Sequence, residues 1–235
     1  GPTIPYKRGD ITDRNGTVLA TSEKIYNLVL DPYVITQSTD EKASEYVAEV
    51  LEEYFSIDQA TVKKTLEEQP NSRYVVLRRK MTYDEKKPYD DFLSSEDEND
   101  QKIISAVSSG IWFEESYQRM YPFSTLACDL IGFTSGDDIG LWGIESYYDK
   151  MLSGTDGRKY GYLNDDVDLQ KVTEEPHNGK TIVSTVDINI QRIAEKYISE
   201  FMQETGAKNV AALVMNPNNG EVLGMANAPV FDLNK

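Results

Sequence analysis

The positions of apolar residues between residues 43 and 55 predict a helix, and a second helix is predicted directly after it. Steps of three and one residue separate the apolar side chains of the first helix, so these side chains share one face: Ala43, Tyr46, Val47, Val50, Leu51, Tyr54 and Phe55. Ser38 and Glu41 have the spacing of a capping box and predict where this helix starts. Ser56–Gln59 repeats the capping pattern and predicts a second helix that runs to about Glu68.

Shorter apolar runs on either side predict β-strands. Thr17–Ala20 and Ile25–Leu30 flank the polar residues Thr21–Lys24, a pattern that predicts two strands behind the turn signal Asn15-Gly16. Two further strands are predicted at Arg73–Arg79 and Gly110–Tyr117.

The next segment mixes a helical pattern with a run of charge. Thr82–Leu93 starts as a helix, but Pro88 leaves open whether the helix continues, because proline lacks the N–H that the helix uses. Gln101–Ser108 predicts another helix. The acidic run between them, Ser94–Asp100, predicts a solvated surface loop. A calcium loop is the alternative, although the run lacks the glycine that such loops use.

Glycines and apolar runs organise the rest of the chain. Seven glycines punctuate Gly132–Gly161 and predict tight, packed loops. Thr181–Val186 predicts a strand, and Asp187 is placed to cap the helix whose apolar positions run from Ile190 to Met202. Gly206 predicts the end of that helix.

An apolar hairpin is predicted near the end of the sequence. Val210–Met215 and Glu221–Ala226 have the pattern of strands, and the turn residues Pro217–Gly220 join them. Residues 179–235 therefore predict the order strand, helix, strand, strand, which is the start of an α+β sheet domain.

Composition places the chain among globular proteins and argues against two classes of partner. The 235 residues, enough for one large or two ordinary domains, are 39% hydrophobic and 27% charged, so we expect a packed core. Forty Asp and Glu against 24 Lys and Arg give a net charge of −16. Such a surface repels phosphates and anionic headgroups, so neither nucleic-acid binding nor electrostatic membrane docking is expected.

Cysteine and histidine each occur once, which limits metal and redox chemistry. Cys128 lies in an apolar stretch and predicts a small buried side chain, and it has no cysteine with which to form an intrachain disulfide. Cys128 and His177 are too few for the usual zinc sites. A magnesium or calcium site built from carboxylates stays open, but no metal ligand is assigned and no cofactor is expected.

No apolar run in the sequence reaches the roughly 18 residues that a membrane-spanning helix needs. The chain starts Gly1-Pro2 without methionine, which is typical of the remnant that a protease leaves. We therefore expect that a preceding segment, an anchor included, has been removed.

Four stretches carry motifs in a fixed order. Arg8–Ala20 reads RGDITDRNGTVLA, Arg119–Pro122 reads RMYP, Gly140–Gly154 reads GLWGIESYYDKMLSG, and Thr185–Gln191 reads TVDINIQ. Together they resemble the RGxIxDRNGxxLA, RxYP, GxxGxE…Y…LxG and TxDxxxQ motifs of the class B penicillin-binding proteins, the bacterial cell-wall D,D-transpeptidases. The resemblance covers essentially the whole chain and is thinnest between about residues 35 and 105. Phe123-Ser124 departs from it, because the family often places glycine after the RxYP proline.

The resemblance implies an α+β fold in two parts. Residues 1–177 would form an elongated pedestal or dimerisation domain, with about 35–117 as an inserted head region. Residues 178–235 would be the incomplete start of the penicillin-binding transpeptidase domain.

The sequence lacks the family's catalytic motifs. In the family, SxxK supplies the acylated serine, and SxN and KTG follow, because the chemistry needs a deprotonated serine and a held oxyanion. No serine here has lysine three residues later, and Lys180-Thr181 is followed by isoleucine. We expect that this chain does not catalyse, whereas its full-length parent would be a serine-type D-Ala-D-Ala transpeptidase.

The charged motif residues are expected to form a structural ion-pair network rather than catalytic carboxylates or a phosphate clamp, because a buried arginine needs a carboxylate partner. Arg8 or Arg14 is predicted to pair with Glu145, and Asp13 is a local alternative partner. An integrin-type use of Arg8-Gly9-Asp10 is not expected, since the family motif accounts for these residues. The candidate residues are Arg8, Gly9, Asp13, Arg14, Asn15, Gly16, Arg119, Pro122, Gly143, Glu145 and Gly154.

The resemblance further implies a scaffold on the extracytoplasmic face of the bacterial cell membrane. Implied partners are a membrane-embedded glycan polymerase and division or elongation proteins, with membrane contact only through an N-terminal anchor. The alternative is a module that itself binds peptidoglycan or a lipid-linked precursor through an exposed aromatic groove. Trp112, Trp142 and the tyrosines are candidates for such a groove, although core or interface packing is the interpretation that we favour. A third hypothesis is self-association through the apolar hairpin.

Overall fold

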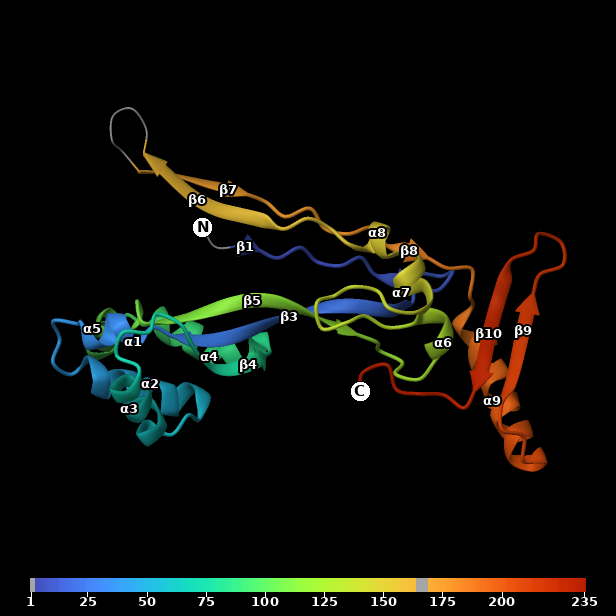
Figure 1. The fold of residues 1–235 in the computed structure, drawn as a ribbon, viewed down its shortest axis with the longest axis horizontal. Helices are drawn as coiled ribbons and strands as arrows, with labels where there is room; N and C mark the ends of the chain where they lie inside the picture. The colour runs from blue at the N-terminus through green and yellow to red at the C-terminus, as the bar shows by residue number, and fades with distance from the viewer. Residues whose placement is uncertain (1–2, 164–168) are drawn as a thin grey trace. The chain divides into compact units, whose positions relative to one another are not determined.

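The computed structural model describes residues 3–163 and 169–235, which fall into two compact units. The discontinuous unit comprises Gly1–Glu23 and Tyr117–Lys235, and the inserted unit comprises Lys24–Ser116. Strands β3 (Val18–Leu30) and β5 (Ile111–Met120) contribute residues to both units (Figure 1). Both units combine helices with strands, so the predicted α+β fold class is confirmed. The predicted domain boundary at residue 177 stays a prediction.

The inserted unit packs helices against three strands, in which β4 (Val75–Met81) and β5 both pair with β3. Its five helices are α1 (Pro32–Thr36), α2 (Ala43–Phe55), α3 (Gln59–Glu68), α4 (Tyr83–Leu93) and α5 (Glu98–Val107). The structure confirms the predicted helices α2 and α3.

An apolar cluster forms the core of the inserted unit. Leu28 and Leu30 of β3 are fully buried in it together with Val47 and Leu51 of α2. Burial of one large apolar side chain stabilises a fold by about 1.5–3 kcal/mol. The apolar face that predicts α2 is therefore the face that holds this unit together.

The predicted capping boxes of α2 and α3 are wrong. Helix α2 begins at Ala43, behind Lys42, without a side-chain cap. The hydroxyl of Ser38 accepts a hydrogen bond from the N–H of Asp40 instead. Ser56 is the C-cap of α2, in the left-handed conformation, and not the start of α3. Serine suits turns as well as caps, so spacing alone does not distinguish the two.

Helix α4 continues through Pro88. A capping box fixes its start, because the Thr82 hydroxyl accepts the N–H of Glu85 at 3.3 Å and the Glu85 carboxylate accepts the N–H of Thr82 at 2.8 Å. Beyond the proline, Tyr89 and Phe92 are buried in the core cluster. Their burial offsets the helix hydrogen bond that proline removes.

Helix α5 starts inside the predicted acidic loop. The Asp97 side chain accepts hydrogen bonds from the N–H groups of Asn99 and Asp100, so it caps a helix that begins at Glu98. The predicted loop is correspondingly shorter, because its carboxylates stabilise the positive end of the helix.

Strand β3 is a single strand of 13 residues, where the pattern predicts two strands and a turn. Thr21–Lys24 contains no glycine, proline or asparagine that would reverse the chain, and Ser22 is buried. Strand β4 begins two residues later than predicted, and β5 extends to Met120.

Two small sheets shape the discontinuous unit. Strands β1 (Thr3–Ile4), β6 (Gly157–Leu163) and β7 (Leu169–Glu174) form an antiparallel sheet, and β2 (Ile11–Thr12) lies between the start of β3 and β8 (Ile182–Val183). Ile11 pairs with Ile182 in parallel, and both contribute to one apolar cluster. The strand predicted at Thr181–Val186 is thus present in its central pair, Ile182–Val183, and this pair joins β2 rather than the hairpin.

Three short helices occupy the segment before β6. They are α6 (Cys128–Ile131), α7 (Gly143–Tyr147) and α8 (Asp149–Leu152). The glycine-rich segment predicted as loops thus contains α7, α8 and the start of β6. Ile131 and Leu152 are buried in the cluster that also holds Ile11.

Helix α9 (Ile188–Thr205) packs on one face of the hairpin formed by β9 (Val210–Met215) and β10 (Val222–Ala228) (Figure 1). The Asp187 side chain accepts the N–H groups of Asn189 and Ile190, and Gly206 ends the helix at φ +69°. Both predicted caps and the hairpin are confirmed. Within residues 3–163 and 169–235, no helix is both long and apolar enough to span a bilayer.

Candidate functional site

Segments far apart in the sequence meet around Glu145, on the short helix α7. Arg8 comes from the segment between β1 and β2, and Arg119 comes from the end of β5. Asp149 lies one helical turn beyond Glu145, at the start of α8. All of these residues belong to the discontinuous unit.

Arg8 makes the most contacts in this network. Its Nε donates to Glu145 Oε2 at 2.8 Å, and Nη2 donates to the backbone carbonyl of Glu145 at 2.9 Å. Nη1 donates to Asp149 Oδ1 at 2.8 Å, and also to the carbonyl of Asp138 and the hydroxyl of Ser153. A planar guanidinium with five donors suits this arrangement, which lysine cannot reproduce.

Arg119 occupies the other oxygen of the same carboxylate. Its Nε donates to Glu145 Oε1 at 2.6 Å, and its Nη1 donates to the hydroxyl of Ser22 at 3.1 Å. The phenol of Tyr121 donates to Glu145 Oε1 at 3.3 Å. Both Glu145 oxygens therefore face protein donors.

Burial makes this network electrostatically strong. Arg8 and Glu145 are fully buried, and the side chain of Arg119 is 4% exposed. Burial disfavours the charged form of Arg8, but the charge of Glu145 and the hydrogen bonds to Asp149 and Glu145 outweigh it, so the pKa of Arg8 lies above its ordinary value. Burial raises the pKa of the Tyr121 phenol, and the charge of Glu145 adds to this effect. The phenol therefore stays a donor.

Backbone contacts that only glycine permits surround the network. A Cβ on Gly9 would lie 1.9 Å from the carbonyl oxygen of Lys180, and one on Gly154 would lie 2.1 Å from that of His177. Gly143 has φ +59°, and a Cβ there would lie 2.5 Å from the carbonyl oxygen of Leu130. Any larger residue would push these segments apart.

Asp13 forms a second buried polar centre and does not pair with an arginine of the network. Its Oδ1 accepts the N–H groups of Asn15 and Thr17 at 2.9 Å each, and its Oδ2 accepts the N–H of Ile188 at 3.2 Å. Burial opposes the charged form, but the backbone hydrogen bonds outweigh it, so the pKa of Asp13 lies below its ordinary value. Asp13 thus links the turn after β2 to the first turn of α9.

Arg14 does not pair with Glu145, so of the two predicted arginine partners only Arg8 is confirmed. The guanidinium of Arg14 is 3.5 Å from Glu221, and both side chains are partly exposed. Its backbone N–H donates to the carbonyl of Val186. Arg14 lies in a turn whose backbone faces the chain before α9, so its side chain points to the surface beside the hairpin.

Three other predicted residues take positions in turns. Asn15 and Gly16 form the exposed turn between β2 and β3, with Gly16 at φ +85°. Pro122 is exposed, in the turn that follows β5. None of the three contacts the Glu145 network through its side chain, since glycine has none and the other two are exposed.

Sequence reasoning did not select several polar residues that the structure brings together. Asp149 is four residues after Glu145, and this spacing of two carboxylates is the signal that could have found it. Gln191 is fully buried, and its side-chain amide both donates to the carbonyl and accepts the N–H of Met225. The motif Thr185–Gln191 includes this glutamine but does not show its partner. Ser22 carries no recognisable signal.

The network offers no reactive group to a substrate. Its carboxylates and guanidinium groups are paired with one another, and all except the partly exposed Asp149 lie in the protein interior. Cys128 is buried, which raises the pKa of its thiol. Within the described ranges, no cluster of three or more His, Cys, Asp or Glu side chains has the arrangement to hold a metal ion.

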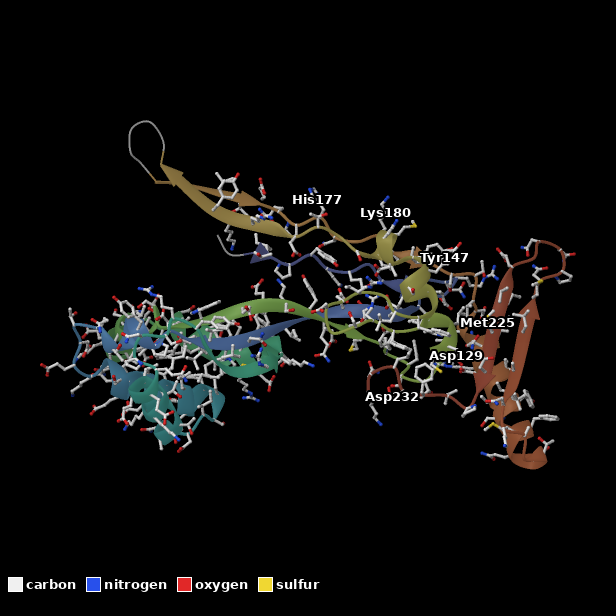
Figure 2. All side chains as sticks on the ribbon, viewed as in Figure 1. Asp129, Tyr147, His177, Lys180, Met225 and Asp232 are labelled. Atoms are coloured by element: carbon white, nitrogen blue, oxygen red, sulfur yellow. The ribbon has the colours of Figure 1, made fainter. Side chains whose placement is uncertain are left out.

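The two tryptophans lie outside the core, so of the two favoured interpretations only interface packing stays a prediction. Trp112 is 40% exposed and Trp142 is 56% exposed. Tyr147 is 82% exposed and lies on the surface of α7 (Figure 2). Trp112 lies two residues after Gly110, and Trp142 lies between Gly140 and Gly143.

Sequence comparison relates the chain to one family. The family model described as "Penicillin-binding Protein dimerisation domain" matches residues 3–184. The probable peptidoglycan D,D-transpeptidase PbpC of Pseudomonas aeruginosa is 29% identical over 234 residues, a match that covers 98% of this chain and 38% of that protein. The chain thus spans about two fifths of the length of such curated relatives.

Comparison with solved structures shows that the chain shares its fold with penicillin-binding proteins. Penicillin-binding protein 2X from Streptococcus thermophilus matches with a TM-score of 0.76 and 24% identity, over 99% of this chain and 36% of that one. A complex between the penicillin-binding protein PBP2 and MreC from Helicobacter pylori matches with a TM-score of 0.63 and 23% identity, over 99% and 43%. Because the family model covers well over half of the residues, this chain belongs to the class B penicillin-binding proteins and carries their dimerisation domain.

Proposed function

We propose that this chain is a non-catalytic scaffold and interaction module of a protein whose full-length form cross-links peptidoglycan by D-Ala-D-Ala transpeptidation. One observation carries the proposal: three charged motif residues, Arg8, Arg119 and Glu145, pair with one another, and Arg8 and Glu145 are fully buried. Such a network holds distant segments together, and its buried ion pairs engage the carboxylate that a reaction would need.

The sequence also supports a non-catalytic role for this chain. SxxK, SxN and KTG do not occur in these 235 residues. Several relatives are named as peptidoglycan D,D-transpeptidases, and this chain corresponds to only part of their length. The acyl-transfer residues would then belong to another part of the parent protein.

Covalent labelling by a fluorescent penicillin tests this proposal. The 235-residue chain should remain unlabelled under conditions that label a full-length relative such as PbpC. Far-UV circular dichroism and a cooperative melt would establish that the tested chain is folded. Stoichiometric labelling of the folded chain would overturn the proposal.

The proposed setting is the extracytoplasmic face of the bacterial cell membrane. The solved complex of PBP2 with MreC supports a partner from the cell-wall machinery, and a glycan polymerase and division or elongation proteins are further proposed partners. Purified candidate partners can be compared by their binding to the folded chain. A scaffold role predicts saturable binding by at least one of them and no peptidoglycan cross-linking by the chain alone.

A second candidate function is binding of glycan strands by the inserted unit. Tyr74 and Trp112 are both exposed, and their ring centroids lie 5.9 Å apart. The Tyr74 hydroxyl donates to the Glu114 carboxylate, which also accepts the side-chain amide of Asn27. Two fixed aromatic rings beside hydrogen-bonding groups suit a sugar face.

Co-sedimentation with purified sacculi distinguishes this function from a spacer role. A glycan-binding platform predicts that the chain sediments and that Trp112→Ala releases it. Tyr147→Ala, which alters an exposed ring of the other unit, is the matched control. A chain that stays in the supernatant would exclude the platform and leave the scaffold proposal intact.

A further inference from the structure

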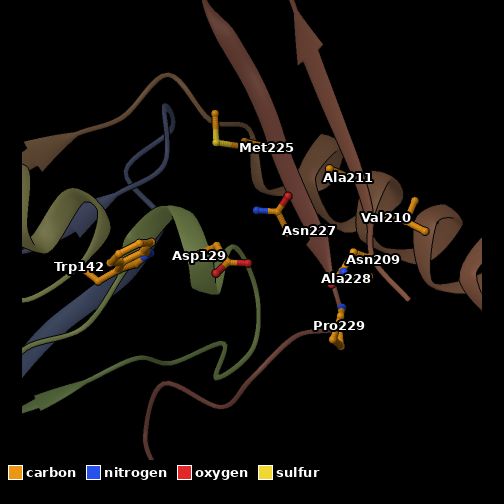
Figure 3. A pocket seen from close by; sticks show the side chains of 9 residues that line it. All are labelled: Asp129, Trp142, Asn209, Val210, Ala211, Met225, Asn227, Ala228 and Pro229. Carbon is orange, nitrogen blue, oxygen red and sulfur yellow. The ribbon is translucent and has the colours of Figure 1, made fainter. Parts of the chain in front are cut away.

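A groove of about 600 Å³ lies within the discontinuous unit, between the α6–α7 region and the β9–β10 hairpin (Figure 3). Its volume falls in the range of sites that bind small molecules or peptide side chains, roughly 300–1,000 Å³. No residue of the Glu145 network lines it. The proposed scaffold function assigns it no role.

One wall of the groove is held in place by backbone packing. Trp142 and Asp129 lie on this wall (Figure 3). A Cβ on Gly132 would lie 1.9 Å from the carbonyl oxygen of Trp142, and Gly143 packs against the carbonyl of Leu130. The backbone of Trp142 therefore sits directly on the segment that follows Asp129. This contact fixes the relative backbone positions from which the indole and the carboxylate project.

The opposite wall is the end of the hairpin. Asn227 of β10 pairs with Ala211 of β9, and both line the groove with Met225. Ala226, between Met225 and Asn227, belongs to the cluster that packs on α9 and does not line the groove, so side chains along this part of β10 alternate between the helix and the groove. The carboxamides of Asn227 and of Asn209 are available to a ligand, because neither side chain makes a hydrogen bond within the described residues.

The charge of the groove has one sign. Asp129 is its charged lining residue, and none of the described lining residues is lysine or arginine. In the part of the chain that the structure describes, no cation pairs with Asp129. Trp142 is 56% exposed, so its ring face is open to solvent. An indole face beside a carboxylate favours a cation, and the net charge of −16 adds long-range attraction.

We propose that this groove binds a lysine or arginine side chain of a short, extended basic peptide segment. The cationic group stacks on the indole of Trp142 and pairs with the carboxylate of Asp129. The carboxamides of Asn209 and Asn227 hydrogen-bond the peptide backbone on either side. A neutral sugar would also stack on the indole, but it would not need the negative charge of Asp129. The charge requirement therefore separates the two ligands.

Fluorescence titration of the 235-residue chain tests the proposal. Trp112→Phe, a change in the inserted unit, leaves Trp142 as the sole tryptophan. The probes are acetyl-Gly-Gly-Arg-Gly-Gly-amide, its lysine counterpart and its glutamine counterpart. The two cationic peptides should change the indole emission and bind about fivefold or more tightly than the glutamine peptide, the ratio expected for an exposed cation–π contact with a carboxylate. Their affinity should fall as salt rises.

Asp129→Asn, made in the Trp112→Phe background, should abolish this preference for cationic peptides, whereas Asp137→Asn should leave it unchanged. Asp137 is the matched control, because it is an exposed aspartate of the same region that does not line the groove. Shifts of the side-chain amide signals of Asn209 and Asn227 in nitrogen–proton spectra provide a second readout. This readout also applies to Trp142→Leu, which should lose the shifts.

Three results would overturn the proposal. The first is equal binding of the arginine and glutamine peptides. The second is an affinity for the arginine peptide that Asp129→Asn leaves unchanged. The third is binding of an N-acetylglucosamine oligomer that is tighter than that of any peptide and insensitive to Asp129→Asn. None of these results depends on penicillin labelling, so failure here leaves the scaffold proposal standing.

Discussion

Buried polar side chains are concentrated in one of the two units. Among the described residues, the buried polar or charged side chains other than Asp31 all belong to the discontinuous unit: Arg8, Thr12, Asp13, Ser22, Glu145 and Gln191. The inserted unit instead buries one apolar cluster that includes Leu28, Leu51 and Phe55. Strands β3 and β5 run through both units, but one unit buries polar side chains and the other buries almost only apolar ones.

Element length accounts for the part of this difference that surrounds Glu145. Helices α6, α7 and α8 have four or five residues, too few to present a continuous apolar face, whereas α2 has 13. Isolated helices shorter than about 12 residues are marginal in water, and very short ones depend on tertiary contacts. In the discontinuous unit, ion pairs and glycine backbone contacts supply these contacts together with the apolar cluster that contains Ile131 and Leu152. The comparison shows two ways of stabilising neighbouring parts of one chain.

The two tryptophans make the comparison measurable, because Trp112 reports on the inserted unit and Trp142 on the discontinuous unit. Trp142→Phe and Trp112→Phe each leave one reporter. Chemical unfolding of these two backgrounds then gives a separate free energy for each unit.

Replacement of Glu145 should have the largest effect. Glu145→Gln leaves Arg8 and Arg119 buried beside a neutral amide, and removal of one partner from a buried ion pair costs about 3–5 kcal/mol. We expect a loss of this size in the free energy of unfolding reported by Trp142. Glu221→Gln is the control, because its pair with Arg14 is partly exposed and contributes at most about 1 kcal/mol. Equal effects of the two substitutions would contradict a structural role for the network.

Truncation of a buried leucine should have the next largest effect, in the other unit. Leu51→Ala removes a fully buried side chain from the apolar cluster and should cost about 2–5 kcal/mol in the unfolding reported by Trp112. Leu213→Ala is the matched control, because Leu213 is 56% exposed and its truncation should cost far less. A loss confined to the Trp142 signal would show that the units do not have separate cores.

Leu51 and Glu145 also differ in how well their contacts can be predicted from the sequence. The apolar spacing around Leu51 predicts both the helix and the face that packs. Glu145 was selected only through its resemblance to a family motif. Arg119 was placed in the same ion-pair network without a stated partner, and Asp149 was not selected. The difference is physical, because helix periodicity is a local property whereas an ion pair across 137 residues depends on how the chain folds back.

Asp13 should show a pH-dependent effect of intermediate size. Its pKa is lowered in the folded state, so its stabilising contribution is present above the ordinary aspartate pKa of about 3.9 and is lost as pH falls through the folded pKa. At pH 7, Asp13→Asn should cost about 1–2 kcal/mol, as for the loss of a helix-capping carboxylate. The gap between wild type and variant should shrink below about pH 4. A gap that stays constant down to pH 2.5 in the Trp142 signal would rule out this role of the charge.

Removal of the observed capping box should have the smallest effect. Thr82→Ala takes away the hydroxyl that accepts the N–H of Glu85 and should cost about 1 kcal/mol in the Trp112 signal. Ser38→Ala tests the cap that spacing predicts but α2 does not use, and should change the free energy by less than half as much. A larger loss of stability for Ser38→Ala than for Thr82→Ala would support the capping role that spacing predicts for Ser38.

Local pattern determined much of this protein. Periodic apolar residues specified α2, Asp187 and Gly206 specified the ends of α9, and turn chemistry specified the hairpin. These features depend on interactions within a few residues, so composition and spacing contain them.

Tertiary structure alone decided the rest. It joined β8 to β2 instead of to the hairpin, placed Arg8 rather than Arg14 against Glu145, and used Asp13 to cap α9. It also left Trp142 exposed beside Asp129, on the wall of a groove that no motif indicates. Each outcome depends on contacts between segments far apart in the chain, whose free energy no local spacing encodes.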